Sequence, residues 1–147
     1  IKPEEIQKVP AGYFWVEYFE GKQLSVDYVK DNGKWKLLNA FEGVRDEKDL
    51  VRFTKWIKQY YQVIPLPIEL QKIDLDKLNV EMIVTDDYKH NIFEVHLRNG
   101  FDDMMKYNEL IPVWKGETKR REGYKFIESK ADGYGGLLYP REGYLVR

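Results

Sequence analysis

The sequence predicts an α+β fold, in which an antiparallel β-sheet packs against one main helix and a loop-rich C-terminal extension follows. Segments that alternate or are rich in aromatic residues, with turn residues between them, predict the strands. One apolar stripe at helical spacing predicts the helix. The 147 residues suffice for one domain with a real core. We expect residues 1–111 to form its body and residues 112–147 to pack on it as the extension.

The N-terminal part of the chain predicts strands joined by tight turns. Residues 13–19 are an aromatic and β-branched run, which favours a strand. Residues 23–30 alternate between apolar and more polar side chains, as a second strand does. The Asp-Asn-Gly-Lys segment at 31–34 predicts a hairpin turn, because Asn-Gly tolerates positive φ. Residues 35–41 are then the returning strand.

The main helix is predicted to follow this hairpin. Asp46 is a suitable N-cap, and the helix should end near Tyr61, ahead of Pro65 and Pro67. Its apolar stripe consists of Leu50, Phe53, Ile57 and Tyr60, which Trp56 and Tyr61 widen. We interpret it as a packing helix without chemistry.

A polar strand face is the candidate active surface. In the strand predicted at 92–98, alternation puts Glu94, His96 and Arg98 on one face. The strand predicted at 78–84 carries Glu81, which would lie across from Glu94 or His96 if the connecting loop has even length.

Two carboxylates on one face repel each other unless a cation lies between them or one is protonated. Mg²⁺ suits such a pair, because it takes one or two carboxylates and completes its shell with water and phosphate oxygens. Arg98 could hold a phosphate or carboxylate in a bidentate grip. The alternative is that these side chains only face water, as polar strand residues commonly do.

The rest of the chain adds two expectations. Residues 102–110 could form a short helix, and a tail-like region begins at Pro112. The last segment is rich in glycine and predicts loops with two short strands.

Composition narrows the class of protein. The net charge of −1 gives no electrostatic case for nucleic acid or an anionic membrane as partner. Cysteine is absent, which excludes disulfides and agrees with a reducing, cytoplasmic compartment. No apolar run approaches the about 20 residues that span a bilayer. The chain starts with Ile, so we interpret it as a processed product or a fragment.

Four stretches in order resemble the C-terminal part of an ATP-grasp domain, over residues 12–105. Residues 16–23 (Val-Glu-Tyr-Phe-Glu-Gly-Lys-Gln) resemble the family's hinge and the turn after it, and residues 24–29 the strand that follows. Residues 78–84 (Leu-Asn-Val-Glu-Met-Ile-Val) resemble the strand with the first acidic metal ligand. Residues 93–98 (Phe-Glu-Val-His-Leu-Arg) resemble the family's Glu-x-Asn-x-Arg strand.

The resemblance implies a role for each matching residue. Val16, Glu17, Tyr18 and Phe19 would cross the hinge at the adenine, and Gln23 would replace a ribose-binding acid. Glu81 and Glu94 would bind Mg²⁺ on ATP, with His96 standing where the family usually has Asn. That imidazole could shift the preference to Mn²⁺. Arg98 would stabilise the phosphate or acyl phosphate in transfer.

The implied activity is that of a ligase, which activates a small carboxylate with ATP for attack by an amine or a similar nucleophile. The family's glycine-rich loop and phosphate-gripping lysines would precede this chain, in the same parent chain or in a partner. We therefore expect the chain alone to be catalytically incompetent. The alternative is a non-catalytic binding or assembly module that uses an aromatic-rich surface.

Overall fold

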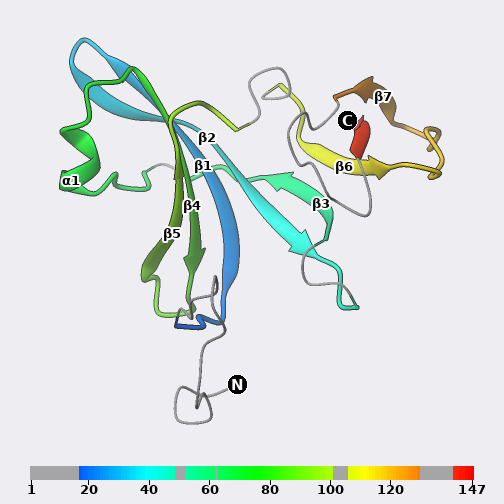
Figure 1. Ribbon diagram of the computed structural model, residues 1–147, viewed down its shortest axis with the longest axis horizontal. Coiled ribbons are helices and arrows are strands. Elements are labelled where there is room, and N and C mark those ends of the chain that lie inside the picture. Colours follow the sequence, from blue (N-terminus) through cyan, green and yellow to red (C-terminus); the bar gives the residue numbers. More distant parts are fainter. Residues whose placement is uncertain (1–16, 49–51, 62, 101–105, 130–140) are drawn as a thin grey trace, which may run out of the picture.

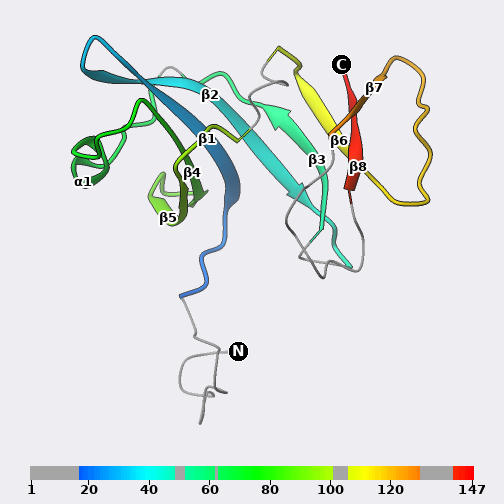
Figure 2. The same ribbon diagram turned by 45° about the horizontal axis from the view of Figure 1, so that its top comes forward.

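The computed structural model describes residues 17–48, 52–61, 63–100, 106–129 and 141–147. Their strands form one antiparallel sheet of eight strands in the order β5-β4-β1-β2-β3-β6-β8-β7 (Figure 1). The long strands β1 and β2 run through its middle, and the C-terminal strands lie at the other end from α1 (Figure 2).

The described elements are β1 (Lys22–Asp31), β2 (Lys34–Arg45), β3 (Phe53–Lys58), α1 (Ile68–Gln71), β4 (Lys77–Val84), β5 (His90–His96), β6 (Glu109–Trp114), β7 (Lys125–Glu128) and β8 (Arg141–Val146). The strands predicted at 23–30, 35–41, 78–84 and 92–98 are thus present as β1, β2, β4 and β5. Within the described ranges, no helix is long and apolar enough to cross a membrane.

The predicted main helix is wrong, and so is the α+β fold class that depended on it. Phe53–Lys58 is strand β3, and the described part of the chain has no helix of seven residues or more. The apolar spacing fits a helix, but Phe53, Thr54, Trp56 and Ile57 are types that favour strands. β3 pairs with β2 on one side and β6 on the other, and this long-range pairing outweighs the local helical pattern.

The C-terminal segment contributes strands to the same sheet. Pro112, where a tail was expected, lies in β6 opposite Tyr144 of β8. β8 is a short strand in the glycine-rich last segment, as predicted, while β7 precedes that segment, and residues 130–140 lie outside the described residues. Most of the short helix expected at 102–110 lies outside the described residues, but Glu109 and Leu110 belong to β6. The expected boundary between residues 111 and 112 therefore falls inside a strand.

Two hydrophobic clusters lie on opposite faces of the sheet. Ala40 pairs with Val26 in β1, while the next residue, Phe41, pairs with Ser25, so their side chains point to opposite sides. The first cluster consists of Leu24, Val26, Tyr28, Ala40, Ile64, Leu66, Leu78, Val80 and Met82. The second consists of Phe41, Trp56, Leu110, Tyr144 and Val146.

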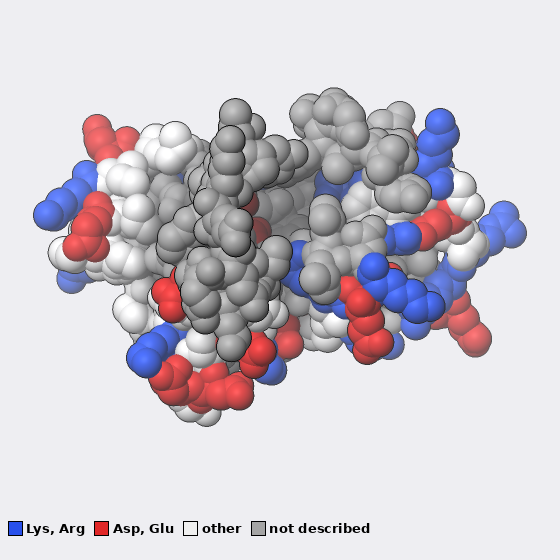
Figure 3. Space-filling model, turned by 60° about the horizontal axis from the view of Figure 1, so that its bottom comes forward, with Lys and Arg blue, Asp and Glu red and all other residues white. Residues whose placement is uncertain are grey.

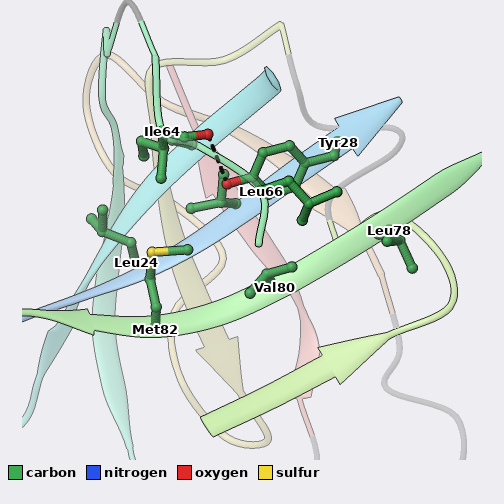
Figure 4. Packing of buried hydrophobic residues seen from close by; sticks show 9 residues of the cluster. Leu24, Tyr28, Ile64, Leu66, Leu78, Val80 and Met82 are labelled. Carbon is green, nitrogen blue, oxygen red and sulfur yellow. Dashed lines mark hydrogen bonds between the residues drawn. The ribbon is translucent and has the colours of Figure 1, made fainter. Parts of the chain in front are cut away.

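The segment after β3 covers the first cluster. Its residues Ile64 and Leu66 pack onto β1 and β4, and the Tyr28 hydroxyl donates a hydrogen bond of 3.1 Å to the Ile64 carbonyl (Figure 4). This leaves the opposite face of β1, β4 and β5 for polar side chains.

The predicted hairpin turn is confirmed. Asn32 and Gly33 have φ of 49° and 73°, which is the positive-φ pair that a two-residue hairpin requires. The turn sets the register in which β1 and β2 pair.

Candidate functional site

The candidate site lies on the polar face of β1, β4 and β5. Glu81 in β4 pairs directly with Glu94 in β5 and, on its other side, with Ser25 in β1. A register shift after Glu81 places Ile92 opposite Met82, which leaves Phe93 as the extra residue of a bulge. The bulge keeps Glu94 facing Glu81 while it changes the pairing of the rest of the strand.

Glu81 is held by a chain of hydrogen bonds across three strands. The Nε2 atom of Gln23 donates to the Glu81 carboxylate over 3.0 Å. The Oε1 atom of Gln23 accepts a hydrogen bond from Arg45, whose guanidinium lies 4.7 Å from the centre of the Phe53 ring. Gln23 was expected at the ribose; its buried amide is engaged at both ends here.

His96 and Arg98 extend the face beyond Glu94. The Nε2 atom of His96 lies 3.5 Å from a carboxylate oxygen of Glu94. Arg98 follows the end of β5, and its guanidinium donates to the Asn99 carbonyl over 3.1 Å. The structure thus brings Glu81, Glu94 and His96 together and places Arg98 next to them along the chain.

Replacing Glu81 with glutamine should stabilise the protein at neutral pH in the absence of divalent cations. Burial raises the pKa of Glu81 above its ordinary 4.5, and Glu94 raises it further; hydrogen bonds from Gln23 and Ser25 and the His96 charge oppose this. The folded state therefore holds this proton more tightly than the unfolded state. Stability from Glu81 is lost as pH rises from the unfolded pKa through the raised folded value.

The measurement is thermal unfolding of wild type and Glu81→Gln between pH 4 and pH 8. The variant should have the higher Tm at pH 7, and its advantage should shrink toward pH 4, where wild-type Glu81 is protonated. Exposed Glu69→Gln on α1 is the matched control and should change little at either pH. An advantage of Glu81→Gln that is the same at both ends of the range would contradict this assignment.

The predicted hinge residues precede β1. Val16 lies outside the described residues. Glu17 and Tyr18 are exposed, with Tyr18 82% accessible, and Phe19 is partly buried. They approach the sheet at the end where Lys22 of β1 pairs with Val84 of β4, which is also the end that carries Gln23.

Apart from Gln23, the sequence does not single out the buried polar residues beside this site. Besides Gln23, these nearly inaccessible residues are Ser25, Asp27, Asn39, Asn79 and Asn99. The signal was the alternation of β1, which puts Gln23, Ser25 and Asp27 on one face. Whether this face is buried depends on the neighbouring strands, because β2 and β4 pair Asp27 with Asn39 and with Asn79.

No group of three or more His, Cys, Asp or Glu side chains within the described ranges is placed to hold a metal ion. A cation at Glu81 and Glu94 would therefore need further oxygen ligands from outside the protein. Water and nucleotide phosphates supply such ligands in magnesium sites.

Charged side chains of both signs lie toward the left and right sides of the face shown in Figure 3. Lys and Arg group on the right, at the β7 end of the molecule, with Asp and Glu among them. Pairs in this region join Arg52 to Glu117, and Lys119 to Glu142 over 2.8 Å. This interleaving agrees with the small net charge of the chain.

Comparison with known proteins gives a distant structural likeness. No family model matches the chain, and no curated protein matches it. A solved structure described as an ATP-grasp superfamily protein from Archaeoglobus fulgidus matches over 89% of this chain, with 13% identity and a TM-score of 0.45. The match covers 47% of that protein, so this chain spans about half its length. A likeness at this level assigns neither a family nor an activity.

Proposed function

We propose that this chain is part of an ATP-grasp-type ligase that binds Mg-ATP and activates a carboxylate as an acyl phosphate for attack by an amine or a similar nucleophile. The observation that carries the proposal is the direct pairing of Glu81 with Glu94 on one sheet face. A divalent cation would relieve their repulsion. Two carboxylates completed by water and phosphate oxygens are a donor set that Mg²⁺ accepts.

Five polar residues on or beside the face have a role in this proposal. Glu81 and Glu94 would hold Mg²⁺, whose bound charge offsets that of the phosphates. His96, whose Nε2 atom lies 3.5 Å from a carboxylate oxygen of Glu94, would orient that ligand without itself completing a three-residue metal site among the described residues. Arg98 would grip the transferred phosphate, since guanidinium matches it bidentately. Gln23, itself bound by Arg45, would orient the Glu81 carboxylate.

The remaining parts of the site would come from elsewhere. Residues 16–19 would line the adenine as the hinge of a C-terminal lobe, to whose sheet residues 112–147 also contribute strands. The glycine-rich loop and lysines of an N-terminal lobe would complete the phosphate site, from the same parent chain or from a partner. The absence of cysteine from the sequence supports the cytoplasm as its location.

The test is a titration of Mg·ATP into the intact protein that carries this chain, with wild type and Glu94→Ala. We expect the variant to bind Mg·ATP at least about tenfold more weakly, because truncation removes one of the ligands (a loss of about 1.4 kcal/mol). Turnover with the carboxylate substrate should fall in parallel. Calorimetry gives the affinity, and phosphate release gives the turnover.

Glu69→Ala is the matched control, because Glu69 is an exposed acid on α1, on the covering segment of the opposite face. It should leave both readouts unchanged. Binding and turnover that are unchanged in Glu94→Ala would count decisively against the proposal.

The second candidate is a non-catalytic binding or assembly module. Its supporting observation is the exposure of large aromatic side chains at the ends and edge of the sheet, namely Tyr18, Tyr60, Tyr88 and Phe93. Exposed aromatic residues are enriched at protein interfaces. A glycine-rich loop and paired lysines encoded upstream of Ile1 would favour the ligase over this module.

A further inference from the structure

A row of buried polar side chains crosses the middle of the sheet, one row away from Glu81 and Glu94. Asp27 in β1 pairs with Asn39 in β2 and with Asn79 in β4. Their exposed fractions are 1%, 3% and 1%. Directly paired strand residues on one face have Cβ atoms about 5 Å apart, so the three side chains form one cluster.

The segment after β5 covers this cluster on the side away from the sheet. The Gly100 amide donates to Asp27 Oδ1 over 2.8 Å, and Asn79 Nδ2 donates to the same oxygen over 2.8 Å. A Cβ on Gly100 would lie only 2.9 Å from Asn79 Nδ2, so there is no room for a side chain here and the Gly100 backbone itself contacts the cluster. Asn99, the residue before Gly100, is 3% exposed, so a further amide is buried next to this backbone contact. We call Asp27, Asn39, Asn79 and Asn99 the asparagine cluster.

The asparagine cluster has more buried acceptors than its own donors satisfy. Asn39 Oδ1, Asn79 Oδ1 and Asn99 Oδ1 have no hydrogen-bond partner in the part of the chain that the structure describes. Among the described residues, Asn39 Nδ2 is the one donor of the cluster that has no hydrogen-bond partner. Leaving a buried polar group without a partner costs about 1–3 kcal/mol. Native proteins retain such groups where they serve a purpose, a bound ion or water among them.

We propose that the asparagine cluster binds a singly charged alkali-metal cation, K⁺ or Na⁺. The surplus consists of neutral amide oxygens, which are hard ligands of the kind such ions accept, and the Asp27 carboxylate supplies a negative charge beside them. A surplus of acceptors calls for a positive ligand, and the buried Asn39 Oδ1 atom is available to coordinate it. The amide oxygens of the cluster lie in the next row of the sheet, about 7 Å along the strands from Glu81 and Glu94, and His96 of the candidate site pairs with Asn79 at the β5 end of this row.

The experiment is thermal unfolding of the chain in KCl, NaCl and choline chloride at equal ionic strength. A ligand that binds only the folded state raises Tm in a saturable way. We expect wild type to gain about 2–8 °C in KCl or NaCl over choline chloride. Asn39→Leu, which removes the amide but keeps a similar volume, should lose this gain.

Asn91→Leu is the matched control. Asn91 lies on β5 in another row of the sheet, opposite Ile83, and its Nδ2 atom also has no partner among the described residues. This variant should keep the full salt-specific gain in Tm. Loss of the gain in both variants, or equal Tm of wild type in all three salts, would overturn the proposal; the latter would leave only buried water in the cluster.

A second measurement does not depend on any variant folding. Crystals of the wild-type chain grown with thallium(I) in place of K⁺ should show an anomalous peak within bonding distance of Asn39 Oδ1. A map without a peak at the cluster would overturn the assignment even if Asn39→Leu fails to fold. Both measurements are made without ATP or divalent cations, so their outcome is independent of the proposed ligase function.

Discussion

Replacing Asp27 with leucine should destabilise the protein by about 2–6 kcal/mol. The Asp27 Oδ1 atom accepts hydrogen bonds from Asn79 Nδ2 and from the Gly100 amide, each over 2.8 Å. Leucine has a similar shape but no acceptor, and each buried donor that loses its partner costs about 1–3 kcal/mol. The measurement is urea denaturation of wild type and Asp27→Leu, with the free energy of unfolding extrapolated to water.

Asp27→Asn is the matched variant, because asparagine keeps an Oδ1 atom at the same position. If the two hydrogen bonds carry the effect, Asp27→Asn should retain a large part of the stability that Asp27→Leu loses. The exposed aspartate Asp31, which pairs with Lys36, gives the baseline: Asp31→Leu should cost about 0–1 kcal/mol. Equal losses in Asp27→Leu and Asp27→Asn would show that the carboxylate charge, rather than its acceptor geometry, matters.

The strands β1, β2, β4 and β5 are predicted correctly because the polarity pattern and turn residues that define them lie within a short stretch of the sequence. β1 and β2 alternate in polarity and are joined by Asn32-Gly33, a pair that by itself favours the hairpin. β4 and β5 likewise lie on either side of a short polar turn. In each case neighbouring segments pair with one another, so the pattern of one segment and its turn is sufficient.

β3 and β6 are the opposite case, because their partners are far away in the sequence. Trp56 of β3 pairs with Leu110 of β6, and Leu110 in turn pairs with Val146 of β8. The stripe of Phe53, Ile57 and Tyr60 fits a helix as well as it fits a half-buried strand. Only the second cluster decides between the two, because it brings Trp56 together with Leu110 and Val146, which follow it by 54 and 90 residues in the sequence.

In the candidate site, too, the features that follow from local sequence patterns could be predicted, and those that depend on distant segments could not. Alternation in β5 correctly predicts that Glu94 and His96 share a face, and the pairing with Glu81 follows from one hairpin. The bulge at Phe93 and the hydrogen bonds of Gln23 to Glu81 and Arg45 depend on side chains from three strands. The asparagine cluster depends in addition on the Gly100 backbone, which no periodicity can reveal.

Truncating Phe41 to alanine should be the most destabilising single change in the second cluster, at about 3–5 kcal/mol. Phe41 is 0% exposed and packs with Trp56, Leu110, Tyr144 and Val146, which come from three other strands. Alanine would remove most of the ring's contacts, and the sheet around it can close the cavity only in part. Because β3, β6 and β8 meet there, the loss should weaken the sheet at the point where its two halves join.

Phe93→Ala is the matched control for this prediction, because the same ring on β5 is 51% exposed. It should cost less than about 1 kcal/mol, since little of its surface leaves water on folding. Phe41→Leu should fall between the two, as leucine refills part of the volume. The free energies of unfolding of all three variants come from urea denaturation, and the slope m reports whether unfolding stays a single transition. If Phe41→Ala costs no more than Phe93→Ala, the second cluster does not join the two halves of the sheet, and the pairing of β3 with β6 must be stabilised by its backbone hydrogen bonds alone.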